Sequence, residues 1–323
     1  MALTHNSYLV LPRLKVQNLN TISSPFTWGA PSITAALGFM HALQRRLPKD
    51  WKWMFTSVGM VIHDFEPQVN GDWVKKFNLT RNPLGKGGET QGIIEEGRAH
   101  AIVSLVFGVF ALGQQVDENQ NQQRLGDISS IVNTMRFAGG SIIPHDHFSQ
   151  LPLFFMEGEE TNELVWGKIK RSLLPGFALL SRDDLLIKHT QYLQSINANA
   201  TALDAWLDLS RINRHCVMEI EEKDGMHSEK IKWEIYRAAG EAGWIVPIPV
   251  GYSALSERYE TGVVNNTRDS RVAFRFVESM CSIGQWVSPH RLFDLTDLLW
   301  SSVTDHQLGI YRCVNKNSLQ EFN

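Results

Sequence analysis

The first 48 residues contain no Asp or Glu, and this acid-free segment constrains the fold more than any other feature of the chain. Its basic side chains include Arg13, Lys15, Arg45 and Arg46. Residues 8–16 have the Leu- and Val-rich composition of a buried strand, and a bulge or an edge is expected at Pro12 because proline donates no ladder hydrogen bond. A polar loop over residues 17–29 comes next. A strand and loop with this charge asymmetry predict a surface for an anion.

An amphipathic helix is expected after the loop, with Pro31 in its first turn and Pro48 ending it. Its apolar face collects Ile33, Leu37, Met40, Gln44 and Leu47.

Composition limits the class of protein. The 323 residues are 43% hydrophobic and 20% charged, which is typical of a globular chain. The net charge of −3 excludes a protein that coats nucleic acid with its whole surface, but it permits one local basic groove. The three cysteines, Cys216, Cys281 and Cys313, form no C-x-x-C pair, so we expect a reducing compartment, no disulfide and no structural zinc. Without a secretory signal or a long apolar run, a cytoplasmic protein with no membrane partner is expected.

The rest of the chain mixes strands and helices. Strands are expected at 51–65, 73–79, 99–110, 177–180 and 243–255, and the Gly-rich connector at 80–98 predicts a protruding hairpin. Helices are expected at 127–137, 166–174, 201–212 (with a Thr201–Asp204 capping box) and 289–303 (with Ser288 as N-cap). The charged segment 218–230 is expected to be mobile. Hairpins outnumber βαβ crossovers, so the predicted class is α+β.

The polar loop holds the first candidate site. Its amides and hydroxyls can donate to phosphates or read base edges, and its tryptophan can stack on an unpaired base; the residues are Asn18, Asn20, Thr21, Ser23, Ser24 and Trp28. The alternative is an ordinary turn in which the polar side chains cap the backbone and the tryptophan lies in the core.

Other signals have weaker support. His41 has the chemistry of a general acid or base, but a half-buried structural histidine is the simpler interpretation. His145-Asp146-His147 offers two metal ligands, and no third ligand is evident, so no metal or other cofactor is expected. The segment NPLGKGGET is not a P-loop, because Gly87 rather than Ser or Thr follows Lys86. No catalytic constellation is found, which favours a binding subunit.

Basic residues gather in two further places. The connector and its flanks carry Lys75, Lys76, Arg81, Lys86 and Arg98. A second group near the C-terminus, with aromatic residues between its members, consists of Arg268, Arg271, Arg275, His290 and Arg291. Such clusters are usually solvated faces, and the aromatic neighbours raise the chance of nucleic-acid contact modestly.

Eight blocks together resemble one known family. They are LPRLKVQNLNTISSPFTWGAPS, GFMHALQRRL, FNLTRNPL, EEGRAH, MRFAGGSIIP, LLPGFALLSR, WIVPIPVGYSALS and WVSPHRL. In this order they resemble the second Csy protein of the type I-F CRISPR surveillance complex, a Cas-five-type subunit of the RAMP superfamily. Residues 111–130, 145–170 and 214–240 do not look like the family's shared blocks.

The resemblance implies a modified RRM-like (ferredoxin-like) core with a thumb hairpin at about 77–98, contained in residues 1–150, and a C-terminal α+β region over residues 151–323. It implies a non-catalytic subunit that pairs with the large Csy subunit, contacts a neighbouring backbone Csy subunit and holds the 5′ handle of the CRISPR RNA. Target DNA would be reached through the assembled complex. Expected RNA-binding residues are Asn18, Asn20, Ser23, Ser24, Trp28, Arg81, Arg98, Arg136, Arg275 and Arg291. The AGGS turn, residues 138–141, is expected to let its backbone approach RNA.

Two alternatives stay open. One is a RAMP endoribonuclease that cuts CRISPR repeat RNA with His41, since some relatives with this fold cleave RNA. The other is an assembly adaptor that touches only protein.

Overall fold

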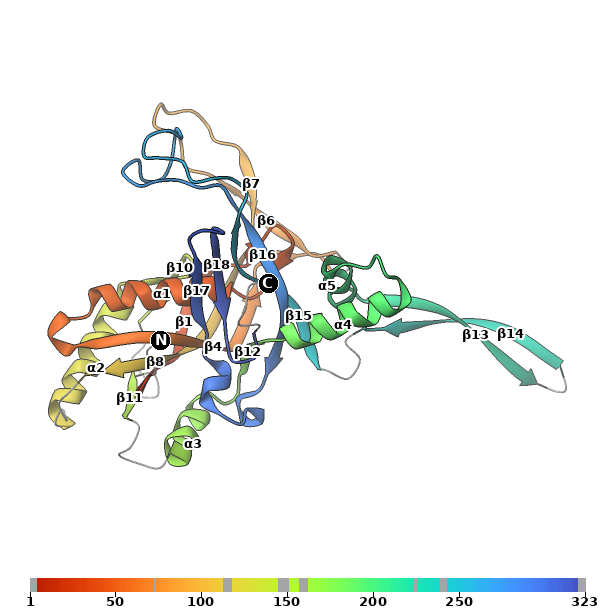
Figure 1. Cartoon of the computed structure of the whole chain (residues 1–323), viewed down its shortest axis with the longest axis horizontal. Helices are drawn as coiled ribbons and strands as arrows, with labels where there is room; N and C mark the ends of the chain where they lie inside the picture. The colour runs from red at the N-terminus through yellow and green to blue at the C-terminus, as the bar shows by residue number, and fades with distance from the viewer. Residues whose placement is uncertain are drawn as a thin grey trace.

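The computed structural model describes residues 5–318, except 73, 113–117, 145–150, 157–161, 224–225 and 239–242. The His145-Asp146-His147 motif lies outside the described residues. The described chain is a mixed α+β structure whose centre is a large curled antiparallel sheet, with helices against it and long hairpins extending from it (Figure 1).

The N-terminal half supplies four central strands and two helices. In chain order they are β1 (Ser7–Asn20), α1 (Ile33–Arg46), β4 (Trp53–Pro67), β8 (Arg98–Ala111), α2 (Glu118–Asn133) and β10 (Gly140–Ile143). In the sheet these strands lie in the order β10-β1-β8-β4, and every neighbouring pair is antiparallel. The two helices therefore connect strands that are not sheet neighbours, as in a split βαβ unit.

The C-terminal half extends the same sheet. Beyond β4 lie β12 (Phe177–Ser181), β16 (Val277–Val287), β15 (Trp244–Ala254), β18 (Ile310–Val314) and β17 (Ser301–Asp305). At the other edge, β9 (Arg136–Phe137) pairs with β10, and β11 (Leu153–Met156) pairs with β1. One hydrogen-bonded sheet thus joins both halves of the chain, and the division at residue 150 stays a prediction.

The apolar run at the start of β1 is buried on both faces of the sheet, which explains why its sequence does not alternate. Leu9 and Leu11 join the larger core beneath α1 and α2, which also contains Phe107. Tyr8 and Val10 face a second core with α3 (Asn162–Ser172). The expected irregularity at Pro12 is confirmed: the register with β8 shifts between Leu11 and Leu14.

The helical elements follow local signals. Ser32 caps α1 by accepting a hydrogen bond from the Thr34 N–H, so Pro31 precedes the helix and does not lie in its first turn. The expected apolar face of α1 is confirmed, and the Gln44 side chain bonds Trp53 O and Phe55 N of β4. The remaining helices are α4 (Asp183–Ile196) and α5 (Ala202–Ser210), and the Thr201–Asp204 capping box is present. No helix in the described part of the chain is long and apolar enough to span a membrane.

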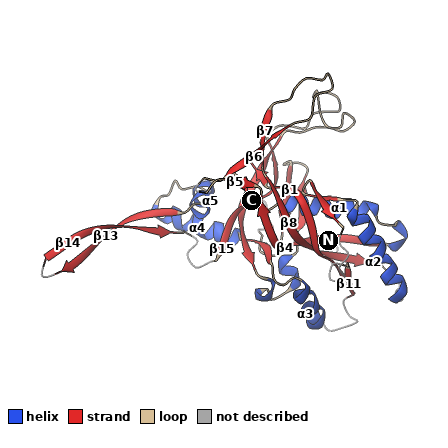
Figure 2. Ribbon diagram, turned by 180° about the vertical axis from the view of Figure 1, so that it is seen from behind, coloured by secondary structure: helices blue, strands red, loops and turns tan. Residues whose placement is uncertain are grey.

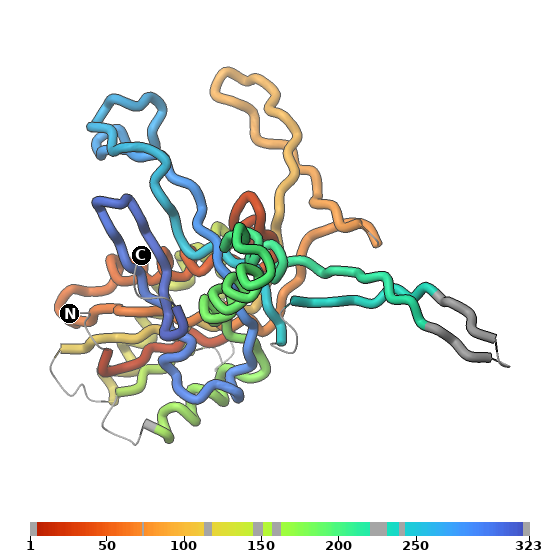
Figure 3. Tube along the Cα trace, turned by 45° about the vertical axis from the view of Figure 1, so that its right-hand side comes forward, coloured from red at the N-terminus to blue at the C-terminus, as the bar shows by residue number. Residues whose placement is uncertain are grey.

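Three segments extend from the body and are seen apart from one another in Figure 3. One contains β5 (Val69–Asn70), β6 (Lys76–Arg81) and β7 (Ile93–Glu96), which confirms the expected protruding hairpin. The second is the hairpin of β13 (Asn213–Lys223) and β14 (Met226–Tyr236), where a mobile segment was expected. The third is the loop at 255–276. Figure 2 shows β13–β14 pointing away from the sheet.

The prediction of a helix at 289–303 is wrong. Two short 3-10 turns, η3 (Pro289–Arg291) and η4 (Leu295–Leu298), replace it, and a third, η1 (Lys49–Trp51), precedes β4. Trp300 then exchanges both backbone hydrogen bonds with Val58 of β4, and its indole N–H donates to Leu179 O. Sheet pairing and burial of this tryptophan outweigh the helical pattern. The helix expected at 127–137 begins earlier, at Glu118, and its last two residues form β9.

Candidate nucleic-acid interface

The polar loop of the acid-free segment is mostly a small hairpin of β2 (Ile22–Ser24) and β3 (Thr27–Trp28), since β1 continues to Asn20. The Asn20 amide brackets Ile22, donating to its carbonyl at 2.7 Å and accepting from its N–H at 3.2 Å. The Ser23 and Ser24 hydroxyls lie 2.8 and 2.6 Å from Thr27 Oγ1. These polar groups therefore hold the turn, as the ordinary-turn alternative requires.

The tryptophan of this hairpin does not behave as that alternative expects. Trp28 is 47% exposed, and its ring contacts Phe77 at the base of β6 with centroids 5.9 Å apart. A half-exposed indole held against a second ring is a rigid platform, which suits stacking on an unpaired base. The hairpin is thus built like a turn, but it presents an aromatic face to solvent.

Asn18 belongs to a separate network at the end of β1. Its φ of +57° accompanies the second register shift of this strand, between Val16 and Leu19. Its side-chain oxygen accepts from Gln68 at 2.8 Å, and its backbone oxygen accepts from Arg98 at 3.2 Å. Asn18 is exposed, but its oxygens hold the strand end in place.

A groove runs from the hairpin across the start of α1 to two tyrosines of the C-terminal strands. Its first part, a cavity of about 400 Å³, is lined by Asn20, Ile22, Ser23, Ser32, Thr34, Ala35, Gly38, Ala138, Tyr252 and Tyr311. The second part, of about 290 Å³, shares Tyr252 and Tyr311 and adds Arg258 and Arg275. We call these two cavities together the tyrosine groove.

The chemistry of the tyrosine groove suits an anionic strand. Its first part contains hydroxyls and amides and no acidic side chain, and it includes the N-terminal turn of α1, where the helix dipole favours negative charge. The rings of Tyr252 and Tyr311 lie 6.5 Å apart, and burial raises the pKa of Tyr311, so its hydroxyl stays protonated. In the second part, Asp305 and His306 lie beside the arginines.

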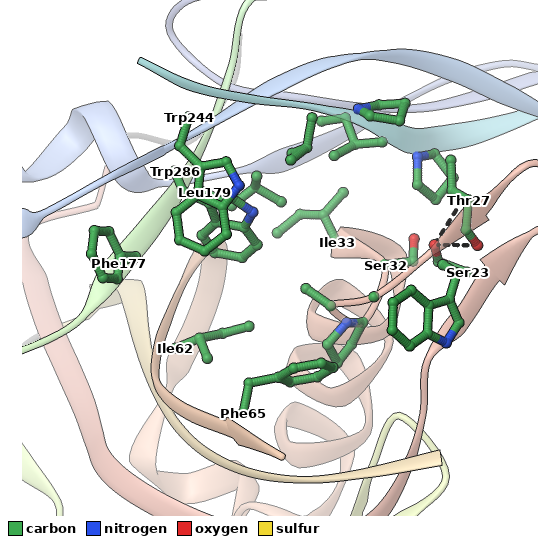
Figure 4. Close-up of a pocket in the computed structure, with 18 of the residues that line it drawn as sticks. Ser23, Thr27, Ser32, Ile33, Ile62, Phe65, Phe177, Leu179, Trp244 and Trp286 are labelled. Atoms are coloured by element: carbon green, nitrogen blue, oxygen red, sulfur yellow. Dashed lines mark hydrogen bonds between the residues drawn. The ribbon is translucent and has the colours of Figure 1, made fainter. Parts of the chain in front are cut away.

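An apolar cleft of about 380 Å³ meets the tyrosine groove at Ser23 and Ser32 (Figure 4). Its aromatic walls come from both halves of the chain, and they are Trp28, Phe65, Phe177, Trp244 and Trp286. Phe177 and Trp244 meet edge to face at 5.5 Å. This second cavity can take a flat or apolar group beside the groove.

The structure divides the expected arginines. Arg98 begins β8 opposite Asn20, the last residue of β1, and is bound to Glu96 at 2.8 Å. Its hydrogen bond holds the pKa of the Glu96 carboxyl below its ordinary value. Arg136 is exposed on β9, roughly 10 Å from Gln17 across two strand spacings. Arg81 is exposed on β6, roughly 13 Å beyond Phe77.

The C-terminal basic group is not one cluster. Arg275 lines the tyrosine groove, whereas Arg291 is exposed in η3. They flank the two ends of β16, an eleven-residue strand that spans roughly 36 Å. The site therefore brings together Asn20, Ser23 and Arg275, places Asn18, Ser24, Trp28, Arg98 and Arg136 near it, and leaves Arg81 and Arg291 apart.

The two glycines of the AGGS turn differ in their surroundings. A Cβ on Gly140 would lie 2.7 Å from the Gln17 carbonyl oxygen and 2.8 Å from the Leu19 nitrogen, so glycine is needed there because the turn packs on the backbone of β1. Gly139, with φ of +78°, turns the chain, and a Cβ there would meet nothing within 4 Å. Close approach of RNA to this turn stays a prediction.

Sequence reasoning missed Thr34, Tyr252, Arg258 and Tyr311. No local pattern singles out these residues, because the groove forms only when β15 and β18 lie opposite α1. The exposed Trp244 and Phe177 were missed for the same reason.

Comparison with known proteins agrees with the resemblance in the sequence. The family model for CRISPR-associated protein (Cas_Csy2) matches residues 9–313. A CRISPR-associated protein Csy2 from Pseudomonas aeruginosa (strain UCBPP-PA14) is 43% identical over 312 residues, which cover 94% of each chain. A match over nearly the whole length, together with this identity, shows that the chain belongs to the Cas_Csy2 family of CRISPR-associated proteins.

Proposed function

We propose that this chain is a non-catalytic subunit of a type I-F CRISPR RNA-guided surveillance complex that holds the 5′ handle of the CRISPR RNA together with the large Csy subunit. The observation that carries this proposal is the first part of the tyrosine groove, an acid-free channel at a helix N-terminus in a chain of the Cas_Csy2 family. A neighbouring backbone Csy subunit and, through the assembled complex, target DNA are the further proposed partners.

The core topology supports this function. The order β1-α1-β4-β8-α2-β10 along the chain, with β10-β1-β8-β4 in the sheet, is that of a ferredoxin-like unit, and we infer an RRM-like core. The β5–β6–β7 extension is the proposed thumb. The three described cysteines are free, which agrees with the proposed cytoplasmic location.

In the proposed mode of binding, the RNA backbone crosses the N-terminal turn of α1 and continues past Tyr252 toward Arg258 and Arg275. An unpaired base stacks on Trp28 or enters the aromatic cleft beside it. Recognition then combines phosphate contacts that position the strand with contacts to splayed bases that read it. This mechanism involves no turnover.

A charge placed in the groove tests the proposal. Thr34→Glu puts a carboxylate at the N-terminus of α1, where the helix dipole stabilises the carboxylate but the carboxylate repels a phosphate. We expect thermal stability to be kept and affinity for the repeat-derived handle RNA to fall about tenfold, equivalent to about 1.4 kcal/mol. Ser130→Glu, on the exposed face of α2, is the control and should leave affinity unchanged. Equal affinities for the two variants would exclude the groove as the RNA site.

The endoribonuclease alternative has one observation in its favour. His41 is exposed and follows Thr34 and Gly38 on one stripe of α1, so it lies about 5 Å along the helix beyond Gly38, which lines the groove. Burial, and secondarily Arg45, lower the pKa of His41, so the imidazole is neutral at pH 7. Incubation with repeat RNA in metal-free buffer distinguishes the binding subunit from the endoribonuclease. Cleavage that disappears in His41→Ala would establish that the protein is an endoribonuclease.

The protein-only adaptor is tested by photocrosslinking of the assembled complex. Our proposal expects crosslinks from the handle to residues 20–38 and to Tyr252 or Tyr311. Handle crosslinks confined to other subunits would favour the adaptor.

A further inference from the structure

The β13–β14 hairpin is an arm without a covering layer among the described residues. It leaves the body beside α5 and extends away from the sheet (Figures 1 and 2). Its ladder pairs Cys216 with Trp233 and Met218 with Ile231. An isolated two-stranded hairpin is marginally stable in water, so a regular arm of this length is expected to gain stability from something that packs on it.

The two faces of the arm differ sharply. Because side chains alternate along a strand, Cys216, Met218, Ile231, Trp233 and Ile235 share one face. Met218, Ile231, Trp233 and Ile235 are each between 64% and 67% exposed. On the opposite face, Lys232 bonds the carboxylates of Glu219 at 3.0 Å and Glu234 at 3.1 Å. The arm is therefore an amphipathic ribbon with both faces exposed: one face is mostly apolar, and the other mixes these charged groups with Val217 and Tyr236.

The composition of the apolar face selects the kind of partner. The exposed area of its side chains sums to roughly 500 Å², at the upper end of the patches found on monomeric proteins. Among the described side chains, Arg214 is the cation on this face, at the base of the arm. A phosphate backbone needs a row of cations, so a nucleic acid is disfavoured.

We propose that this apolar face docks onto an uncharged, apolar surface of another protein subunit of the assembly. The area is below the about 800 Å² per partner of a standard interface, so the arm adds to a larger contact and does not replace it. Trp233, at the centre of the face, has the size and position of an anchor residue. The inference rests on the proposed function only in requiring a multi-subunit complex.

Cys216 provides a native probe of this contact. It lies on the apolar face and is exposed in the isolated chain, whereas burial raises the pKa of Cys281 and raises that of Cys313 to about 12. The assembled complex is treated with N-ethylmaleimide, with and without prior RNase digestion, and the labelling of Cys216 is followed by mass spectrometry. We expect labelling at least about tenfold slower than in the same complex dissociated in urea, with or without RNase. Equal rates in the native and dissociated complex would overturn the inference.

Two variants identify what covers the thiol. Trp233→Glu is expected to restore fast labelling of Cys216 and to weaken retention of one protein subunit in a high-salt wash. Lys232→Ser, one residue away on the opposite face, should do neither. If RNase digestion alone restores labelling while every protein subunit is retained, RNA covers the arm and the inference is wrong. A complex that purifies without CRISPR RNA would refute the proposed function, but the comparison between the two variants would still decide the role of the arm.

Discussion

Replacing Trp28 with alanine separates a binding role from a structural role. With 47% of the residue exposed, roughly 130 Å² of its surface is buried. At about 25 cal/mol per Å² this bounds the loss of unfolding free energy at about 3 kcal/mol. Loss of one stacked base costs about 1–3 kcal/mol of binding, so affinity should fall about 5- to 150-fold. We therefore expect the variant to remain folded and to bind RNA more weakly.

The assay measures handle-RNA affinity by fluorescence anisotropy, corrected for the folded fraction from thermal melts. Trp28→Phe keeps a ring against Phe77 and should recover most of the affinity. Phe26→Ala, at the tip of the same hairpin, should be near neutral because Phe26 is 79% exposed and does not line the cleft. A collapse of thermal stability in Trp28→Ala, with unchanged affinity per folded molecule, would show that Trp28 is structural and would refute the reasoning.

Three further predictions concern stability. Arg312→Met removes the ion pair between Arg312 and the buried Asp183 carboxylate and should lower the unfolding free energy by about 3–5 kcal/mol in urea titrations, with partial recovery in Arg312→Met/Asp183→Asn. Burial lowers the pKa of His63 below its unfolded value of 6.5. The contribution of His63 to stability is therefore present above that pH and is lost as the pH falls through the folded pKa. His63→Gln should flatten this part of the pH dependence of Tm. Gly140→Ala should cost about 1–3 kcal/mol by thermal unfolding, because its Cβ would meet the Gln17 carbonyl oxygen at 2.7 Å.

Features that depend on neighbouring residues were predictable from the sequence. The bulge near Pro12, the buried face of α1 and the Thr201–Asp204 capping box each depend on residues that are close together in the sequence. The same holds for the protruding hairpin, which the Gly-rich connector signals.

Features that depend on distant partners were not predictable. The segment 289–303 has a helical pattern, but Trp300 pairs with Val58, more than two hundred residues earlier. Residues 218–230 have the composition of a charged, mobile segment, but they belong to the hairpin at 213–236, whose alternating pattern is evident only once its register is known. For the candidate site, the residues of the β2–β3 hairpin could be identified from its polar composition. Tyr252 and Tyr311 could not, because they form the opposite wall of the groove and no local pattern distinguishes them.

The continuity of the sheet determines how this groove can bind. One wall, the tyrosines of β15 and β18, belongs to the ladder that runs from β1 to β18. The other wall, the start of α1, packs on the same sheet through the core that Ile33 and Leu37 share with Ile248 and Val250 of β15. Opening the groove like a hinge would therefore require α1 to leave this core. A ligand therefore meets a cavity of set width, and most of the ordering entropy of association falls on the ligand itself. Selectivity would then come from which strand conformations can enter, before any base is read.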